Sequence, residues 1–342
     1  MEFAFDPTRR RVLKGGVSAA AIATFASPMI GLGAAFAQPA QPLSFQLSWI
    51  KSIQYGGFFA GVELGSFTKF GVDPTFVSGG PNIDPVANVA SGQSQLGDRP
   101  IGSLVVAREK GIPIKVIGTV FQKSPYSVIS LAKTPIKTPQ DMKGKTIAVS
   151  TSGRPLILYM ILQAGLKADD VNLVPSAPDP AALVSGQIDG YCGYVTNQGV
   201  MLQTRGVEIY ALNAQDLGLP ETTGTLYGRE DFLTANKPLV VNFLKGAIAA
   251  HGWALKNPEA TAKLMVEKYG APGLDYKAQL TEIKESKPYI EFGPGTTKGL
   301  LALDLPLFAN IIDVYRKVGI VKTDMKVEDL CDPTYINAAL SV

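Results

Sequence analysis

From residue 43 onward the sequence alternates short apolar segments of strand length with amphipathic segments of helical period. This alternation is typical of α/β proteins, in which helices cover the faces of a mainly parallel sheet. Strands are predicted at 43–47, 72–77, 114–121, 126–131, 146–149, 171–174, 188–193 and 207–212. Helices are predicted between them at 58–64, 85–90, 101–110, 156–163, 181–184 and 198–204. Beyond residue 229 longer helical patterns dominate, at 238–256, 258–269, 276–286 and 300–317.

A short pattern occurs twice in this part of the chain. Asp84-Pro85 leads into NVASGQ at 88–93 and a short strand that ends near Gly97, and Asp179-Pro180 leads into ALVSGQ at 182–187 and a strand. Each copy combines a helix start at Asp-Pro, an apolar helix, a glycine at the helix end and an immediate strand. The repetition predicts two lobes of similar plan. The alternative is coincidence between common helix-capping sequences.

The N-terminus has the pattern of an export signal. RRRVLK at 9–14 precedes an apolar, Ala- and Gly-rich stretch that ends in AFA at 35–37. A charged start, an apolar centre and a small-x-small cleavage site define a secretory signal peptide, and paired arginines indicate the bacterial Tat route. We therefore expect residues 1–37 to be a Tat signal peptide and the mature protein to lie in the periplasm.

Length and charge limit the number of domains and the classes of partner that the chain can have. About 305 residues remain after residue 37. This length suggests two domains, since a domain usually has about 100–200 residues. The formal charge of +3 falls to near +1 without the signal, and no Lys/Arg-rich run is present. Nucleic acid is therefore not an expected partner. No later segment has the uninterrupted apolar length of a membrane helix.

Catalytic and metal-binding patterns are sparse. His251 is the only histidine, and HExxH, CxxC and GxSxG do not occur. We expect no metal, no cofactor and no enzyme activity, and His251 is interpreted as a core or surface residue. Cys192 and Cys331 are the only thiols. They either form a disulfide in an oxidising compartment or stay free, and a buried free Cys192 is the favoured interpretation.

Several motifs resemble the substrate-binding proteins of ABC importers for nitrate, sulfonates, taurine and thiamine pyrimidines such as formylaminopyrimidine and hydroxymethylpyrimidine. In the first half they are LSW at 47–49, QYGGFFA at 54–60, FGV at 70–72, GGP at 79–81, ASGQ at 90–93 and GIP at 111–113. In the second half they are TPQDMKGKT at 138–146 and SGQID at 185–189. Their order and spacing cover about residues 43–215.

The resemblance implies a two-lobed periplasmic-binding-protein fold of type II. In this fold two α/β lobes are joined by two crossing strands, and the ligand lies in the cleft between them. The first lobe is expected at 43–123 plus 225–342 and the second at 124–224, with crossings near Ser124-Pro125 and Gly224-Thr225. The implied partners are a small-molecule ligand and an inner-membrane permease, and the protein is expected to be a monomer.

Ligands of open α/β sheets lie beyond the carboxyl ends of the strands. This rule selects residues on the first lobe that have both a ligand-binding and a structural interpretation. A Trp at a strand exit either stacks on a planar ligand or caps the core, and the Gly-rich turn either admits a ligand or only turns the chain. The charged pair either holds a polar group or caps a helix. The residues concerned are Trp49, Gln54, Tyr55, Gly80, Asn82, Asp98, Arg99 and Gln122.

The same rule selects residues on the second lobe. STSGRP at 150–155 lies between a strand and a helix, where hydroxyls and free N–H groups suit an anion and Arg154 adds a guanidinium. The alternative for this turn is plain helix capping. Tyr194 and Asn197 follow the strand predicted at 188–193. The expected ligand contacts on this lobe are Thr151, Arg154, Tyr194 and Asn197.

The aromatic residues suggest a planar heterocycle, such as a thiamine pyrimidine or a flavin precursor, and the arginines suggest a sulfonate, carboxylate or phosphate. Trp49 and Tyr55 are expected to stack on the ligand body while Arg154 holds its polar end. Two other functions remain open. One is a pyrimidine-synthase-like enzyme of the same fold, and the other is a periplasmic ligand sensor.

Overall fold

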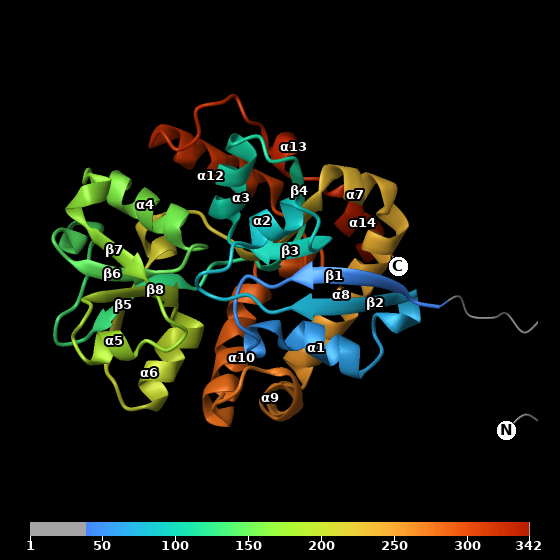
Figure 1. The fold of residues 1–342 in the computed structure, drawn as a ribbon, viewed down its shortest axis with the longest axis horizontal. Helices are drawn as coiled ribbons and strands as arrows, with labels where there is room; N and C mark the ends of the chain where they lie inside the picture. Colours follow the sequence, from blue (N-terminus) through green and yellow to red (C-terminus); the bar gives the residue numbers. More distant parts are fainter. Residues whose placement is uncertain (1–38, 342) are drawn as a thin grey trace, which may run out of the picture. The chain divides into compact units, whose positions relative to one another are not determined.

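The computed structural model describes residues 39–341, which contain two five-stranded sheets with helices packed around each (Figure 1). Each sheet is the centre of one α/β lobe, and the two-lobed α/β prediction is confirmed. None of the helices in this part of the chain is both long and apolar enough to cross a bilayer. The predicted signal peptide at 1–37 lies outside the described residues.

The first sheet has the strand order β2-β1-β3-β10-β4. Its strands are β1 (Gln41–Gln46), β2 (Val72–Val77), β3 (Leu96–Arg99), β4 (Ile114–Phe121) and β10 (Thr223–Arg229). β1 pairs in parallel with β2 and β3, and β10 runs antiparallel between β3 and β4. Because helices cover this sheet on both faces, β4 is buried along nearly its whole length.

The second sheet repeats this plan with the order β7-β6-β8-β5-β9. Its strands are β5 (Tyr126–Leu131), β6 (Thr146–Val149), β7 (Asn172–Pro175), β8 (Gly190–Tyr194) and β9 (Ile209–Asn213). β6 is parallel to β7 and β8, and β5 runs antiparallel to both β8 and β9. In both sheets the fourth strand is thus the antiparallel one.

The repeated sequence pattern occupies equivalent places in the two sheets. Helix α2 (Pro85–Ala90) leads into β3, and helix α5 (Ala181–Val184) leads into β8, which are the third strands of their sheets. Gly92 and Gly186 end the two helices with φ angles of 79° and 76°. These angles lie in the left-handed region, which glycine enters without steric cost. The prediction of two lobes of similar plan is therefore confirmed.

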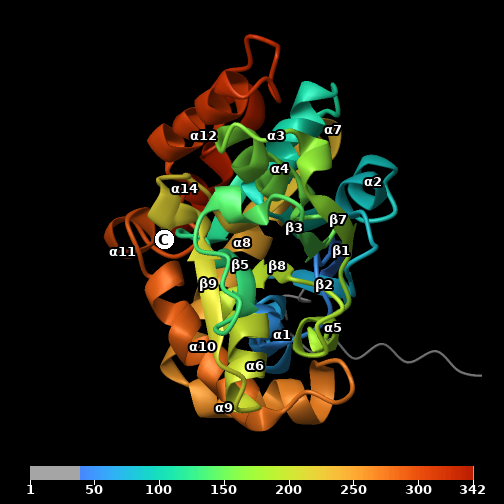
Figure 2. The ribbon, with the colours of Figure 1, turned by 90° about the vertical axis from the view of Figure 1, so that its left-hand side faces the viewer.

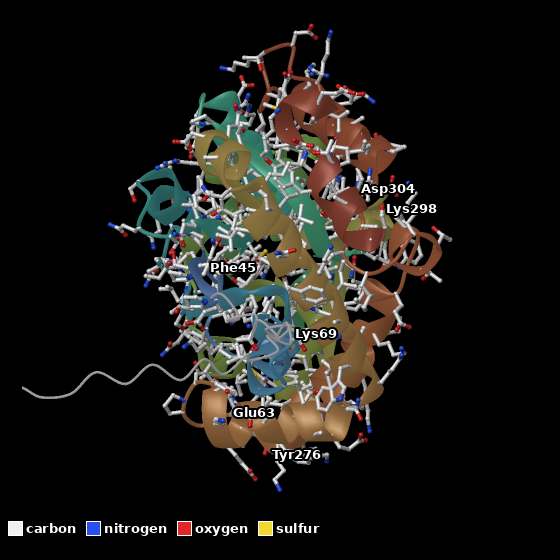
Figure 3. The ribbon with its side chains drawn as sticks, turned by 90° about the vertical axis from the view of Figure 1, so that its right-hand side faces the viewer. Phe45, Glu63, Lys69, Tyr276, Lys298 and Asp304 are labelled. Carbon is white, nitrogen blue, oxygen red and sulfur yellow. The ribbon has the colours of Figure 1, made fainter. Side chains whose placement is uncertain are left out.

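Most of the remaining helices surround the first sheet. They are α1 (Gly56–Glu63), α3 (Ile101–Glu109), α7 (Glu230–Ala235), α8 (Lys237–Lys256), α9 (Pro258–Leu264), α11 (Pro294–Thr297), α12 (Leu305–Lys317), α13 (Val327–Leu330) and α14 (Thr334–Leu340). α1 packs on α8, where a Cβ at Gly57 would lie 2.5 Å from the ring of His251. Beneath them Phe45, labelled in Figure 3, packs against Phe58 and Phe243 with ring centroids 5.1 and 5.6 Å away.

Around the second sheet lie α4 (Arg154–Gln163), α5 and α6 (Val200–Thr204), and the helical turn η5 (Val195–Gly199) precedes α6. Two pairings of helical elements between the lobes stand out. α4 packs against α3 of the first lobe, and α10 (Tyr276–Ile290), from the C-terminal third, packs against η5 and α6 (Figures 1 and 2).

The chain crosses between the sheets twice. It leaves the first sheet at Phe121 and enters the second at Tyr126, and it leaves the second at Asn213 and re-enters the first at Thr223. The predicted crossings near Ser124-Pro125 and Gly224-Thr225 fall in or beside these two segments. The lobe boundaries of 43–123 plus 225–342 and 124–224 stay a prediction.

Among the elements that differ from the sequence prediction, β10 and α12 have a clear physical reason. β10 was not among the predicted strands, because its glycines and threonines give no apolar alternation. The helix predicted from residue 300 begins instead at Leu305, so that prediction was wrong at its start. Leu301 has a φ of 66°, which a helix excludes. The carboxylate of Asp304 then caps the helix by accepting from the Leu307 N–H at 3.1 Å.

Candidate functional site

A cavity of about 30 Å³, called the main cavity below, lies between the two sheets. Its walls come from the ends of β1 and β3 on one side and from the ends of β6 and β8 on the other, as expected for ligand sites in α/β sheets. The residues that line it are Ser48, Trp49, Gln54, Pro100, Tyr126, Ser150, Ser152, Tyr191, Cys192, Gly193, Tyr194 and Gln198.

On the first lobe a chain of hydrogen bonds holds the loop that carries Trp49. The Trp49 N–H lies 3.0 Å from the Tyr55 hydroxyl, which is 3.0 Å from the Ser48 hydroxyl. Ser48 donates to Asp98 twice, from its hydroxyl at 2.7 Å and from its N–H at 2.9 Å. Burial raises the pKa of Asp98 to about 6. Asp98 and Tyr55 therefore support the wall from behind, and only Ser48 and Trp49 of this group line the cavity.

In the Gly-rich turn after β2, the neighbouring backbone leaves no room for a side chain at one position. A Cβ at Gly79 would lie 2.1 Å from the carbonyl oxygen of Leu47, whereas a Cβ at Gly80 would meet only Ile83 at 3.9 Å. The Gly79 N–H donates to the Trp49 carbonyl at 3.0 Å. Gly79 is thus the position of this turn that holds the Trp49 loop in place.

On the second lobe, aromatic rings and hydroxyls form the wall. The hydroxyls of Tyr126 and Ser150 are 3.2 Å apart, and the rings of Tyr126 and Tyr194 meet edge to face with centroids 5.3 Å apart. The Tyr194 hydroxyl forms a hydrogen bond with the Thr223 hydroxyl. The backbone N–H of Tyr194 donates to the Gln198 side chain at 3.0 Å. Tyr194, a residue that the sequence selected as a ligand contact, lines the cavity.

Four predicted residues lie away from the main cavity. The amide nitrogen of Gln122 donates to the carbonyls of Thr119 and Ala302, at 3.0 and 2.9 Å. Asn197 donates to the buried carboxyl of Glu282 at 2.6 Å. Gly80 is buried and Asn82 is exposed, and neither lines the cavity.

Three further predicted residues line a second and larger cavity. Arg99, Thr151 and Arg154 face a groove of about 360 Å³ between α3 and α4. Trp49 and Arg154 therefore line different cavities, so this arrangement does not place both on one ligand. Ligand contact by each of the twelve predicted residues stays a prediction.

The lobes are in contact across the strip between the two cavities. The Thr151 hydroxyl and N–H both donate to the Pro81 carbonyl, at 3.0 and 3.1 Å. The Ser103 hydroxyl donates to the Ser152 carbonyl at 2.8 Å. The structure is thus a closed form.

Sequence reasoning did not name Ser48, Pro100, Cys192 and Gln198 as ligand contacts, although all four line the main cavity. Each lies within a few residues of a strand end, so a broader use of the strand-end rule would have included them. Gln198 was assigned to the start of a helix instead.

The thiols and the histidine are buried. Cys192 and Cys331 are both free, as favoured for Cys192, and burial raises the pKa of each thiol well above its usual value. His251 Nδ1 lies 2.8 Å from the Ala247 carbonyl, which can only accept, so Nδ1 carries the proton. Burial lowers the pKa of His251 to about 4, and the ring is neutral at pH 7. Of the two interpretations of His251, core or surface residue, the structure shows the core residue.

Buried carboxyls lie at the contacts between the lobes. Glu282 of α10 accepts from Asn197 of η5, and burial raises its pKa to about 8. Glu221, in the segment that returns to the first sheet, accepts from the Gly102 N–H at 3.3 Å, and burial raises its pKa to about 8 as well. Both groups are mainly protonated at neutral pH.

Comparisons with known proteins agree with this geometry. Residues 52–261 match the family described as NMT1/THI5 like. The riboflavin-binding protein RibY of Chloroflexus aurantiacus is 23% identical over 91% of this chain and 92% of its own length. The formylaminopyrimidine-binding protein of Halalkalibacterium halodurans is 23% identical over 66% of this chain and 70% of its own. The taurine-binding periplasmic protein of Escherichia coli is 31% identical over 52% and 56%.

Two further similarities bear on fold and activity. The alkanesulfonate-binding protein SsuA from Xanthomonas axonopodis pv. citri, solved with MOPS bound, superposes with a TM-score of 0.67 at 17% identity and covers 86% of this chain and 99% of its own. A 4-amino-5-hydroxymethyl-2-methylpyrimidine phosphate synthase from Schizosaccharomyces pombe is 23% identical over 47% of each chain. The structural similarity to SsuA supports the two-lobed fold. The similarity to the synthase shows that the relatives include an enzyme.

Proposed function

Because the chain belongs to the NMT1/THI5 like family, we propose that it is a periplasmic solute-binding protein that delivers a small organic molecule to an ABC importer. The observation that carries the proposal is the main cavity, which is lined by strand ends of both lobes. Binding proteins for riboflavin, formylaminopyrimidine and taurine among its relatives support this role.

The ligand assigned to the main cavity is a planar heterocycle, such as a thiamine pyrimidine or a flavin precursor. Trp49, Tyr126 and Tyr194 supply aromatic surface, and Ser48 and Ser150 supply hydroxyls. Among the described residues, none that lines this cavity is charged. A sulfonate or carboxylate would lack a cationic partner there, so such an anion is the second candidate.

The closed form leaves little room, and the lobes must separate before a ligand enters. Sites for small organic molecules usually enclose about 300–1,000 Å³, whereas this cavity has about 30 Å³. The hydrogen bonds from Thr151 to Pro81 and from Ser103 to Ser152 close the gap between the lobes. Ligand exchange therefore requires these contacts to break by a hinge motion.

A titration tests the proposal directly. Riboflavin, formylaminopyrimidine, hydroxymethylpyrimidine and taurine are added separately and followed by calorimetry and by tryptophan fluorescence. The chain has two Trp residues, so a Trp253→Phe variant leaves Trp49 as the only indole. We expect a heterocycle to bind and to quench this indole, and Trp49→Ala to weaken binding at least about threefold through lost stacking.

Two results would contradict the proposal. Binding of taurine without any heterocycle would exclude the assigned ligand class. Binding of a heterocycle that leaves the Trp49 fluorescence unchanged and is unaffected by Trp49→Ala would place the ligand outside the main cavity.

The enzyme and the sensor are the alternative functions. The synthase relative favours the first, but the buried thiol of Cys192 and the neutral, buried His251 offer no activated nucleophile or base. Neighbouring genes distinguish the importer component from the sensor. Permease and ATPase genes accompany an importer, whereas a kinase or cyclase gene accompanies a sensor.

A further inference from the structure

The groove between α3 and α4 is larger than the main cavity and differs from it in chemistry. Its volume is about 360 Å³, within the range of small-ligand sites. α2 and α3 of the first lobe form one wall and α4 of the second lobe forms the other. The residues that line it are Asp84, Val86, Arg99, Ser103, Val106, Ala107, Lys110, Ile112, Thr151, Arg154, Pro155, Leu158 and Ile320.

Three cations and one acid line this groove. Arg99 is almost fully buried and pairs with Asp84 through one guanidinium nitrogen, while its Nε has no partner. Lys110 and Arg154 are exposed, and neither forms an ion pair with any residue from 39 to 341. With Asp84 neutralised by Arg99, the groove retains an excess of two positive charges, one from each lobe.

The rest of the lining is mainly apolar. Val106 and Ile112 come from the first lobe, and Pro155 and Leu158 come from α4. Ser103 and Thr151 already donate across the lobes to backbone carbonyls. The groove thus combines apolar walls with two free cations, and this combination suits a molecule with an apolar body and one anionic group.

We propose that the α3–α4 groove is a second binding site, separate from the main cavity, for an organic anion with a body the size of a single ring. Lys110 and Arg154 hold the carboxylate or sulfonate, and the apolar side chains cover the ring. Because the walls belong to different lobes, the bound anion stabilises the closed form.

Benzoate and benzenesulfonate are the probes, and benzamide is their neutral counterpart. We expect calorimetry to show saturable binding of both anions and at least about tenfold weaker binding of benzamide, since it forms no charge-assisted bonds. The double variant Lys110→Gln/Arg154→Gln should weaken benzoate binding about tenfold or more. Affinity should also fall as ionic strength rises, because both cations are exposed.

Two control variants and one groove-filling variant separate this site from the proposed function. Trp49→Ala alters the main cavity and should leave benzoate affinity unchanged. Lys133→Gln removes an exposed charge outside the groove and should also have no effect. Leu158→Trp fills the groove without a change of charge and should abolish benzoate binding. Because Leu158 is half-buried, the thermal midpoint of each variant is measured first.

The proposal is overturned if neither anion binds saturably to the wild-type protein. It is equally overturned if Trp49→Ala removes benzoate binding while Lys110→Gln/Arg154→Gln retains it, because the probe then occupies the main cavity. A loss in Lys133→Gln as large as in Lys110→Gln/Arg154→Gln would also overturn it, because overall charge rather than the groove would then explain the effect. Loss of heterocycle binding with intact benzoate binding would contradict the proposed function alone.

Discussion

The carboxyl of Asp98 supports the wall of the main cavity without lining the cavity. Ser48 donates to it from both its N–H and its hydroxyl, and the chain of hydroxyls continues through Tyr55 to the Trp49 N–H. A network of this kind specifies one geometry because each buried member needs its partner. The orientation of Trp49 thus depends on a residue that does not itself line the main cavity.

Replacing Asp98 should therefore cost stability. Asp98→Ala leaves the Ser48 N–H without a buried acceptor, and we expect a loss of about 1–3 kcal/mol in the free energy of unfolding. Urea unfolding at pH 7 measures this loss. Asp98→Asn is the matched control, because its amide oxygen still accepts from the Ser48 N–H, and it should lose less. Equal stability of Asp98→Ala and the wild type would show that the network does not hold the loop.

Contacts between elements place buried acids at the lobe boundary. Glu282 of α10 meets Asn197 of η5, and burial, together with the charge of Glu285, raises the pKa of Glu282 from 4.5 to about 8. Between these two values the folded protein binds a proton that the unfolded chain has released. Stability contributed by this group is thus fully present below about pH 4.5 and is lost as the pH rises through 8.

A variant that cannot ionise should remove this loss. Glu282→Gln keeps an oxygen that accepts from Asn197, and its stability relative to the wild type should increase as the pH rises from 5 to 9, by a few kcal/mol at most. Urea unfolding of both proteins across this range provides the test. Glu285→Gln, at an exposed neighbour, serves as the control and should change the pH profile less. A constant difference between Glu282→Gln and the wild type would mean that Glu282 titrates normally.

At the scale of the whole molecule, the balance between open and closed forms depends on a few bonds between the lobes. Thr151 and Ser103 donate to backbone carbonyls of the opposite lobe, at 3.0 and 2.8 Å. The rings of Tyr159 in α4 and Tyr315 in α12 stack with centroids 5.4 Å apart. These contacts lie on the α3–α4 side, beside the groove that residues of both lobes line.

Removing the two hydroxyls should open the unliganded protein. Thr151→Val/Ser103→Ala deletes two hydrogen bonds worth about 1 kcal/mol each, and we expect small-angle scattering to show a larger radius of gyration than for the wild type. A saturating ligand of the main cavity should reduce the radius again. Ser185→Ala, at an exposed hydroxyl within the second lobe, is the control. An unchanged radius in the double variant would show that these bonds do not decide closure.

Local sequence patterns determined most of the elements, because strand alternation, helix caps and glycine turns act within a few residues of one another. β2, β4, β5 and β6 begin and end where the pattern predicts, and the Asp-Pro repeat identified equivalent places in two sheets. The strand-end rule likewise selected Trp49, Gln54 and Tyr194, which line the main cavity.

Only the tertiary structure decided which of these side chains meet. The side-chain amide of Gln122 donates a hydrogen bond to the carbonyl of Ala302, 180 residues away. The side chain of Asn197 donates one to the carboxyl of Glu282, 85 residues away. Trp49 and Arg154 both follow strands, yet the contact of Thr151 with Pro81 separates their cavities. No local pattern encodes such pairs, because buried polar groups bond to whatever partner the packing of distant elements brings within about 3 Å.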